Sequence, residues 1–261
     1  MIPIDEIICG DNVEILDTFP ADCIDLVITS PPYGDLRTYG GNSWDFECVS
    51  QQLWKVVKPG GVVVWVVADQ TIDGSESGES FRQALRFKEI GFRLHDTMIW
   101  LKASFSFPEA TRYHSFFEYM FVLSNGSPAA KNLIKDKPSK YAGVKIHGTG
   151  RQQDGQTRPH SVAVRGLNRR VKDNGQRGNV WLMPNVGKAG GKHPATFPEA
   201  LARDHILSWS NDDDIVLDPF NGSGTTTKMA REMGRRYIGI EIHSEYCEIA
   251  RNRLSQQLLP I

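Results

Sequence analysis

Short apolar segments that lack polar alternation recur along this 261-residue chain. Residues 62–67 read VVVWVV and residues 25–29 read DLVIT, which is typical of strands buried on both faces of a parallel sheet. Amphipathic windows separate most of these segments, so the sequence predicts an α/β domain. Because no helical window separates 92–101 from 116–123, we expect that pair to form an antiparallel edge. The expected strands are 23–29, 61–67, 92–101, 116–123, 215–217 and 237–240, and the expected helices are 45–58, 80–90, 198–209, 225–233 and 244–257.

Several classes of protein are excluded by what the sequence lacks. No apolar run approaches the ~18 residues of a membrane span, and the first residues, MIPIDEIICGDN, lack the charged and apolar regions of a signal peptide. The four cysteines, Cys9, Cys23, Cys48 and Cys247, form no CxxC pair, so neither a zinc site nor a disulfide framework is predicted. We therefore expect a cytoplasmic protein that needs no metal ion.

The formal net charge of −1 conceals two parts of opposite sign. Residues 127–192 hold 14 Lys and Arg against 3 Asp and Glu, whereas the other 195 residues hold 16 basic and 28 acidic side chains. This basic segment lacks apolar periodicity, and long irregular segments inside a domain are usually functional or disordered. We expect an insertion at 127–192 within a domain formed by 1–126 and 193–261. The charge asymmetry points to a polyanionic partner, with a solvated basic loop as the alternative.

A glycine-rich turn near the C-terminus is the strongest local signal. Residues 215–230 read IVLDPFNGSGTTTKMA, in which an apolar strand ends at Asp218, a turn carries Gly222 and Gly224, and a helix follows. Glycines let the backbone turn tightly and approach a ligand, and the N–H groups at a helix start favour an anionic group. Glu241 closes the next strand, where an acid can bind both hydroxyls of a ribose.

This turn departs from two common nucleotide-binding motifs. Thr227 occupies the third glycine position of GxGxxG, and the GxxxxGK of a P-loop is absent. Asp218 would repel a pyrophosphate but could bind an ammonium group. A ligand with a ribose, an amino group and a carboxylate fits these features, and S-adenosylmethionine has all three. A dinucleotide and a purely structural turn are the alternatives on this motif alone.

A second signal follows the predicted strand at 23–29, which runs into Ser30, Pro31, Pro32 and Tyr33. The two prolines fix φ and remove two backbone donors, which leaves rigid carbonyl acceptors. The tyrosine ring is suited to stacking on a planar base. Exocyclic amines need such acceptors and bases need a stacking partner, although a proline-stiffened turn with a buried tyrosine is the simpler interpretation of this motif by itself.

Taken together, TSPPY around Ser30 and DPFNGSGTT from Asp218 resemble the motifs of the DNA amino-methyltransferases, which methylate exocyclic amines of cytosine or adenine. The resemblance covers nearly the whole chain, and the order of the motifs matches the β class of that family. It implies a Rossmann-like methyltransferase fold with a mostly parallel seven-stranded sheet, one antiparallel edge strand and a target-recognition insertion at 127–192. It also implies S-adenosylmethionine as the cofactor and base flipping from duplex DNA.

The resemblance implies roles for individual residues. Ser30 and Pro31 would accept the two hydrogen bonds of the target amine, with Ser30 as an orienting acceptor rather than a strong base. The catalytic candidates are Ser30, Pro31, Pro32 and Tyr33. The cofactor-binding candidates are Asp11, His193, Phe197, Asp218, Phe220, Gly222, Ser223, Gly224, Thr225 and Glu241. From their charge and position, the DNA-binding candidates are Arg37, Tyr39, Arg151, Arg158, Arg165, Arg169, Arg170 and Lys172.

The target base, the function class and the partners each have an alternative. SPPY, and HPATFP at 193–198, are more typical of cytosine-N4 enzymes than of adenine-N6 enzymes, so cytosine is favoured over adenine. The other function classes are a non-catalytic nucleic-acid-binding module, a methyltransferase for RNA or a protein amide, and a Rossmann oxidoreductase. A cognate restriction endonuclease is a candidate partner, and we expect a monomer or homodimer that does not contact a membrane.

Overall fold

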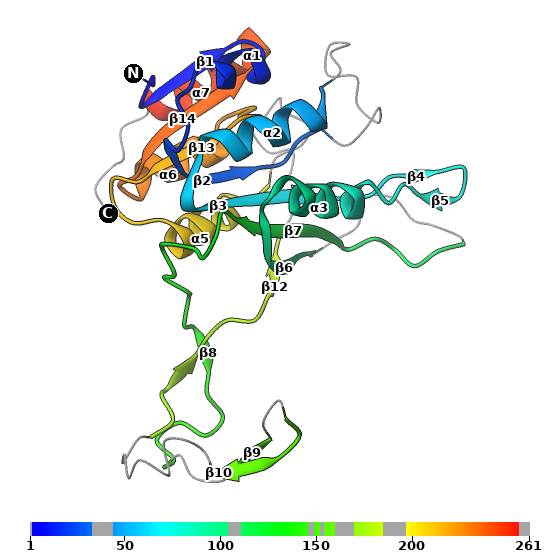
Figure 1. Ribbon diagram of the computed structural model, residues 1–261, viewed down its shortest axis with the longest axis vertical. Coiled ribbons are helices and arrows are strands. Elements are labelled where there is room, and N and C mark those ends of the chain that lie inside the picture. The colour runs from blue at the N-terminus through cyan, green and yellow to red at the C-terminus, as the bar shows by residue number, and fades with distance from the viewer. Residues whose placement is uncertain are drawn as a thin grey trace. The chain divides into compact units, whose positions relative to one another are not determined.

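An eight-stranded sheet forms the centre of the structure, a computed structural model that describes residues 2–32, 44–103, 111–145, 149–151, 154–159, 170–184 and 197–255 (Figure 1). The strand order is β1-β14-β13-β2-β3-β7-β6-β12. These strands are β1 (Glu6–Cys9), β2 (Ile24–Thr29), β3 (Val57–Val67), β6 (Arg93–Lys102), β7 (Phe117–Ser124), β12 (Val180–Met183), β13 (Ile215–Asp218) and β14 (Arg236–Glu241). The helices are α1 (Asn12–Asp17), α2 (Phe46–Val56), α3 (Glu79–Ile90), α5 (Glu199–Trp209), α6 (Thr225–Glu232) and α7 (Ser244–Ser255).

The sheet is mostly parallel, as expected, but two of its expected details are wrong. It has eight strands rather than seven, because β12 pairs in parallel with β6, placing Val180 opposite Ile99. The antiparallel strand is β7, and it lies inside the sheet between β3 and β6 rather than at an edge. The antiparallel pairing expected between 92–101 and 116–123 is confirmed by β6 and β7.

Each expected helix and strand is present with shifted ends, and the last two residues of the expected helix 244–257 lie outside the described residues. β1 and α1 are additional elements near the N-terminus. Local capping explains two of the helix starts, because Asp11 accepts hydrogen bonds from the first turn of α1 and Asp45 does so for α2. No helix in the described part of the chain is long and apolar enough to cross a membrane.

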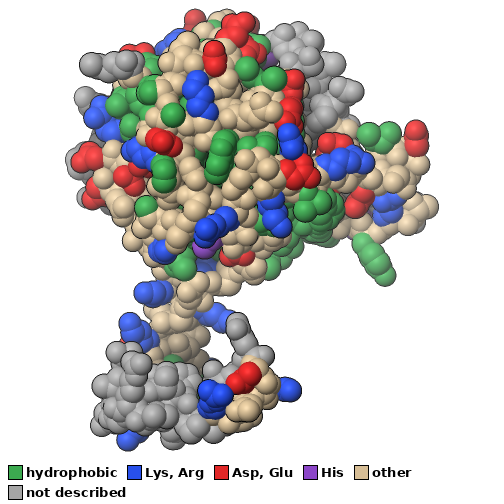
Figure 2. Space-filling view, in the orientation of Figure 1, with side chains coloured by type: hydrophobic (Ala, Val, Ile, Leu, Met, Phe, Trp, Pro, Cys, Tyr) green, Lys and Arg blue, Asp and Glu red, His purple; other side chains and the backbone are tan. Residues whose placement is uncertain are grey.

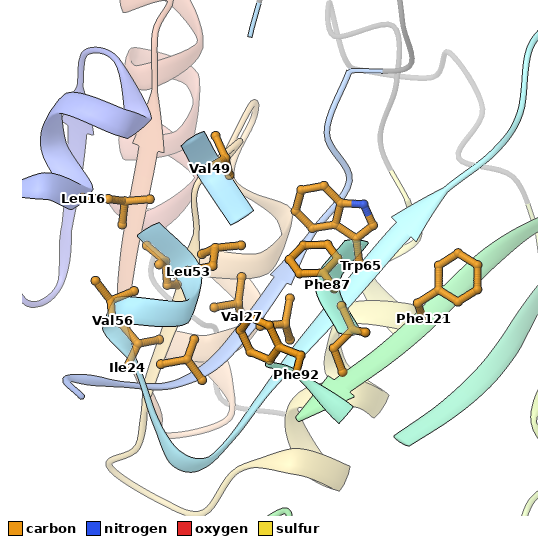
Figure 3. Close-up of a cluster of buried hydrophobic side chains, with 14 of the residues drawn as sticks. Leu16, Ile24, Val27, Val49, Leu53, Val56, Trp65, Phe87, Phe92 and Phe121 are labelled. Carbon is orange, nitrogen blue, oxygen red and sulfur yellow. The ribbon is translucent and has the colours of Figure 1, made fainter. Parts of the chain in front are cut away.

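Helices cover both faces of the sheet (Figure 1). On one face α1 packs on α2 and α2 on α3, and on the other α5 packs on α6 and α6 on α7. Figure 3 shows the core of the first face, where Leu53 of α2 and Phe87 of α3 lie against Val27 and Trp65 of the central strands. These four side chains are fully buried, and burial of large apolar side chains is the dominant favourable contribution to folding.

The chain divides into two compact units, Met1–Asn132 with Asn179–Ile261, and Leu133–Gly178. The smaller unit contains the strand pairs β8 (Lys137–Pro138) with β11 (Asn174–Gly175) and β9 (Thr149–Arg151) with β10 (Thr157–Pro159). The remaining short pair, β4 (Thr71–Ile72) with β5 (Ser75–Glu76), belongs to the larger unit.

The smaller unit at 133–178 lies within the insertion expected at 127–192 and is shorter than it. At the first boundary, Asn132 donates its backbone N–H to the Ser208 carbonyl at 2.9 Å and its side-chain amide to the Ser210 carbonyl at 3.1 Å. At the second boundary, β12 belongs to the central sheet. Residues flanking 133–178 are therefore held by the larger unit through hydrogen bonds that a search for local apolar periodicity does not detect.

Candidate active site

The carboxyl ends of four neighbouring parallel strands, β1, β14, β13 and β2, meet at one edge of the sheet. The chain passes from β13 to β14 in one direction through α6, and from β2 to β3 in the opposite direction through α2. The ends of β13 and β2 therefore flank the point where the strand order reverses, which is where open α/β sheets bind their ligands. Asp218 ends β13 and Ser30 follows β2, so the structure brings the two sequence signals together.

Asp218 is 3% exposed at this reversal point. Its Oδ1 accepts hydrogen bonds from the Thr29 hydroxyl at 2.7 Å and from the Phe220 N–H at 3.1 Å. Burial raises the pKa of the Asp218 carboxyl to about 6, although hydrogen bonds from Thr29, Thr226 and Phe220 act in the opposite direction. Because a neighbouring cation would favour the ionised form, this carboxylate is suited to an ammonium group.

Glu241, at the end of β14, is a buried carboxylate that backbone donors hold in place. Its Oε2 accepts a hydrogen bond from the Gly222 N–H at 2.8 Å, and its Oε1 accepts one from the His243 N–H at 2.9 Å. Gly10, directly after β1, donates its N–H to the Glu241 carbonyl at 2.9 Å. Each carboxylate oxygen has two lone pairs, so the fixed Glu241 side chain retains acceptors for the hydroxyls of a ligand.

The turn between β13 and α6 depends on two glycines in the left-handed region. Gly222 has a φ of 50° and Gly224 a φ of 82°, and other residues rarely adopt these values. A Cβ on Gly224 would also lie 2.9 Å from the Cβ of Ala250, so this glycine lets α6 and α7 approach closely. Arg253 of α7 holds Ser223 by donating to its carbonyl at 2.8 Å and to its hydroxyl at 3.1 Å.

Asn221 is a buried residue of the same turn that the sequence analysis missed. Its N–H donates to the Ile240 carbonyl at 2.9 Å, and its Oδ1 accepts a hydrogen bond from the Thr227 hydroxyl at 3.0 Å. The Asn221 Nδ2 is buried and has no hydrogen-bond partner among the described residues. Thr225, the first residue of α6, is also buried. No local signal identifies Asn221, because its backbone N–H is bound by β14, a strand farther along the chain.

Asp11 lies at the same edge of the sheet, between β1 and α1. As the N-cap of α1, its Oδ1 accepts hydrogen bonds from the N–H groups of Val13 at 2.8 Å and Glu14 at 3.1 Å. The next residue, Asn12, donates its side-chain amide to the Pro219 carbonyl at 3.0 Å. This bond fastens the segment after β1 to the glycine-rich turn, so the Asp11 loop belongs to the same site as that turn.

The segment after β2 is held by a residue that the sequence analysis also missed. Pro31 is buried, whereas Ser30 and Pro32 are partly buried. The Trp44 indole Nε1–H donates to the Pro32 carbonyl at 3.1 Å. The same indole meets the ring of Phe220 edge-on, with ring centroids 5.0 Å apart. Trp44 therefore contacts both the proline segment and the turn after β13.

Four of the DNA-binding candidates are exposed or partly exposed in the smaller unit: Arg151 on β9, Arg158 on β10, Arg170 and Lys172. Arg158 forms an ion pair with Asp154 at 2.9 Å. The unit as a whole holds 11 Lys and Arg against 3 Asp and Glu. On the face drawn in Figure 2, the charged side chains drawn in colour on this unit are mostly basic, whereas the larger unit shows both acidic and basic ones.

The remaining candidates are placed less fully. Phe197 is buried and directly precedes Pro198, the N-cap of α5. Six candidates lie outside the described residues: Tyr33, Arg37, Tyr39, Arg165, Arg169 and His193. In the part of the chain that the structure describes, no three His, Cys, Asp or Glu side chains gather as a metal-binding group.

The fold and the site define a class of protein: an α/β enzyme-like domain in which two fixed carboxylates, Asp218 and Glu241, lie where the strand order reverses. The proline segment that starts at Ser30, which we call the acceptor segment, lies at the same place. Comparison with known proteins agrees with this class and makes it specific. Residues 24–252 match the model of the N6/N4 DNA methylase family. The chain belongs to this family.

Named relatives match over most of their length. The orphan methyltransferase M.BamHII of Bacillus amyloliquefaciens is 53% identical over 248 residues, which is 91% of each chain. The DNA adenine methyltransferase YhdJ of Escherichia coli K12 is 30% identical over 255 residues, covering 95% of this chain and 82% of that one. TTHA0409 of Thermus thermophilus, solved in complex with S-adenosyl-L-methionine, has a TM-score of 0.63 and 26% identity over 96% and 93% of the two chains.

Several expectations from the sequence are thereby confirmed. The protein is an S-adenosylmethionine-dependent DNA amino-methyltransferase with a Rossmann-like fold. The resemblance seen in TSPPY and DPFNGSGTT identified the family correctly.

Proposed function

We propose that this protein transfers the methyl group of S-adenosylmethionine to the exocyclic N4 amine of cytosine in duplex DNA. One observation carries the proposal. The Thr29 hydroxyl at the end of β2 donates to Asp218 at the end of β13 over 2.7 Å, so the acceptor segment that starts at Ser30 lies beside the carboxylate proposed to bind the cofactor. A donor site and an acceptor site for one methyl group need this proximity.

The cofactor site is proposed to use the two fixed carboxylates. Asp218 would bind the cofactor's ammonium group, and Glu241 would accept hydrogen bonds from the ribose hydroxyls. The residues fit this ligand: Asp218 is a buried acid that a cation would favour, Glu241 is oriented by two backbone donors, and the Asn221 Nδ2 is a buried donor without a partner among the described residues. Asp11 would contact the adenine. Bound S-adenosylmethionine supplies a methyl group on a positively charged sulfur.

The other cofactor contacts follow from the backbone of the same edge. Phe220, Gly222, Ser223, Gly224 and Thr225 form the turn and the first residue of α6. The N–H groups at this helix start would face the cofactor's carboxylate. His193 and Phe197 are proposed to flank its methionine end, as the family resemblance implies.

The acceptor site would orient the target amine rather than ionise it. The Ser30 hydroxyl oxygen and the Pro31 carbonyl would each accept one N–H of the amine, which directs the nitrogen lone pair toward the methyl group. Pro32 plays a different part, because its carbonyl already accepts the Trp44 indole N–H. Tyr33 would stack on the flipped base. Since a serine hydroxyl is a very weak acid, the proton would leave the amine only after methyl transfer has made it acidic.

The smaller unit is proposed as the target-recognition region. Its excess of basic side chains suits contact with phosphates, which position a protein on DNA, while a few side chains reach base edges and specify sequence. Arg151, Arg158, Arg170 and Lys172 are proposed for these contacts because they are accessible in this unit. Arg37, Tyr39, Arg165 and Arg169 are proposed on sequence alone. An endonuclease that cuts the same site is the proposed biological partner.

A second candidate function is methylation of the N6 amine of adenine. The 30% identical relative from Escherichia coli is named a DNA adenine methyltransferase, which favours adenine. The serine at position 30 and the HPATFP sequence at 193–198 favour cytosine. Both amines present two N–H groups and a delocalised lone pair, so the same acceptors would serve either base.

The experiment that decides the base is expression in a host without DNA methylation, followed by mass spectrometry of the nucleosides. We expect N4-methylcytosine in the DNA of expressing cells and much less of it in cells expressing the Ser30→Ala variant. N6-methyladenine instead would select the second candidate. Absence of both modified nucleosides, with intact soluble protein in the cells, would overturn the proposal.

A further inference from the structure

Trp44 is a single side chain that contacts both halves of the proposed site. From its contacts we infer that Trp44 is a positioning residue for methyl transfer, whose indole N–H holds the Pro32 carbonyl and thereby orients the neighbouring Pro31 carbonyl, the proposed acceptor of the target amine. The inference rests on the proposed function, because it concerns the acceptor segment described there. In this role Trp44 would act through the Pro32 carbonyl rather than by a contact of its own with the cofactor or the base.

The hydrogen bond from Trp44 is directed at the two prolines of the acceptor segment. Pro31 and Pro32 have no backbone N–H, so they cannot anchor themselves by donating hydrogen bonds. The Pro32 carbonyl accepts the Trp44 Nε1–H at 3.1 Å. This bond holds the Pro32 carbonyl, and because the ring of Pro32 restricts its φ, only ψ of Pro32 separates the held peptide from the peptide of the Pro31 carbonyl.

Trp44 is itself well anchored, which a positioning residue requires. It directly precedes Asp45, the N-cap of α2, whose Oδ1 accepts hydrogen bonds from the Glu47 N–H at 2.8 Å and the Cys48 N–H at 3.2 Å. The indole also packs against Trp65 of β3, with ring centroids 6.1 Å apart. The donor is thus attached to the start of a capped helix and to the central sheet.

The second contact of Trp44 links the acceptor segment to the turn after β13. Its ring meets Phe220 edge-on at 5.0 Å, and Phe220 donates its backbone N–H to Asp218 at 3.1 Å. The hydrogen bond and the ring contact have separable consequences. Loss of the N–H alone should disturb the acceptor carbonyls, whereas loss of the whole ring should also disturb the turn that carries Asp218.

The chain provides a matched control in Trp54 of α2. Trp54 is also partly buried and also meets an aromatic ring edge-on, Phe92 at 4.9 Å. Its indole makes no hydrogen bond among the described residues. Trp44→Phe and Trp54→Phe therefore remove a similar amount of apolar surface, but only the first removes a hydrogen bond to the acceptor segment.

The test measures single-turnover methyl transfer from labelled S-adenosylmethionine to unmethylated genomic DNA, together with cofactor Kd and Tm, for the full-length proteins. We expect Trp44→Phe to slow transfer about tenfold to a hundredfold, because small misplacements of reacting groups cost this much. Its cofactor Kd and Tm should match those of Trp54→Phe, which transfers at nearly the wild-type rate. Trp44→Ala should in addition weaken cofactor binding.

Two outcomes would overturn the inference. One is a Trp44→Phe variant that transfers at the rate of Trp54→Phe. The other is a Trp44→Phe variant whose slower transfer is accompanied by an equal loss of Tm or cofactor affinity, since that marks a general structural role. Failure of the wild-type protein to transfer methyl groups would instead overturn the proposed function, so the two failures are distinguishable.

Discussion

At Asp218 the proposed binding of the cofactor and the stability of the fold place opposite demands on the same carboxyl group. Its carboxyl is buried and its pKa is raised to about 6, so at neutral pH the folded protein holds a charge that the unfolded chain would solvate better. The pKa of this carboxyl is higher in the folded protein than in the unfolded chain. The free-energy cost of keeping it ionised in the fold is therefore absent below about pH 4 and complete above about pH 7. The charge is retained, we propose, because it binds the cofactor's ammonium group.

Asp218→Asn should therefore stabilise the protein while weakening cofactor binding. The shift from 3.8 to about 6 corresponds to up to about 3 kcal/mol at pH 7.5. Chemical denaturation should show that the variant's gain in the free energy of unfolding is smaller at pH 5 than at pH 7.5. Calorimetry should show at least a roughly tenfold weaker Kd for S-adenosylmethionine, as expected for loss of a charge-assisted hydrogen bond. An advantage equal at both pH values would contradict this account of Asp218.

Gly239 of β14 provides a test of how closely the turn between β13 and α6, which we call the cofactor turn, is packed. A Cβ at this position would lie 2.6 Å from the Asn221 side chain and 2.7 Å from the Ile7 Cδ1. Gly239→Ala should displace Asn221 and the turn it belongs to, costing about 1–3 kcal/mol of stability and weakening cofactor binding in calorimetry. Gly178→Ala is the control, since nothing lies within 4 Å of its added Cβ. Equal Tm and Kd for the two variants would show that the turn tolerates the displacement.

At the scale of elements, α5, α6 and α7 are joined around the outside of the cofactor turn. Arg253 of α7 donates to Ser223 and to the Glu199 carboxylate at 2.7 Å, and Lys228 of α6 donates to the same carboxylate at 2.8 Å. Burial acts to raise the pKa of Glu199, but the hydrogen bonds and charges of Lys228 and Arg253 prevail, so its pKa is lowered. Glu199 is thus held ionised between the two cations.

Arg253→Ala should loosen this outer support. We expect a loss of about 1–3 kcal/mol in the free energy of unfolding, with weaker cofactor binding because Ser223 loses both hydrogen bonds from the guanidinium. Arg253→Lys should not restore binding, since a lysine has a single donor group at one point. The measurement is denaturation with calorimetry beside Arg231→Ala, an exposed arginine in the last turn of α6. An Arg231→Ala effect as large as that of Arg253→Ala would contradict the specific role.

The elements show what the sequence could and could not predict. Continuous apolar runs such as VVVWVV predicted the central strands, because strands buried on both faces need no polar alternation. β12 was missed because only four residues carry it, and two of them, Val180 and Leu182, are exposed at the edge. In the site, Asp218 and Glu241 were predictable since each ends a strand. Trp44 and Asn221 were not, because their partners Pro32 and Ile240 are brought to them only by the folded sheet.

At the scale of the whole molecule, charge is separated between the two units. The smaller unit holds 11 basic against 3 acidic side chains, although the chain has a net charge of −1. If this unit contacts phosphates, counterion release should make DNA binding weaken steeply with salt. A net charge of −1 by itself gives no reason to expect DNA binding that depends steeply on salt. The salt response therefore tests whether the smaller unit contacts DNA.

Removing two charges from the smaller unit should reduce that salt dependence. The double variant Arg151→Ala, Lys172→Ala should lower the slope of log Kd against log salt by about 2, at about 0.9 per phosphate contact. The control removes Lys88 and Arg231, which lie in the last turns of α3 and α6, at the sheet edge opposite the site. Titration of labelled duplex at several salt concentrations checks both. A flat salt response of the wild type, or equal slopes for the two variants, would refute the assignment.

The most direct test of the whole account is the single-turnover rate of methyl transfer for wild type, Ser30→Ala and the control Ser75→Ala, whose serine lies on the short strand β5. Ser30→Ala should slow transfer about a hundredfold, because an orienting acceptor is lost. Its cofactor Kd should stay within about twofold of wild type, since the serine acts only on the amine. Ser75→Ala should transfer like wild type. A Ser30→Ala variant that methylates DNA at the wild-type rate would contradict the central claim that this segment holds the target amine.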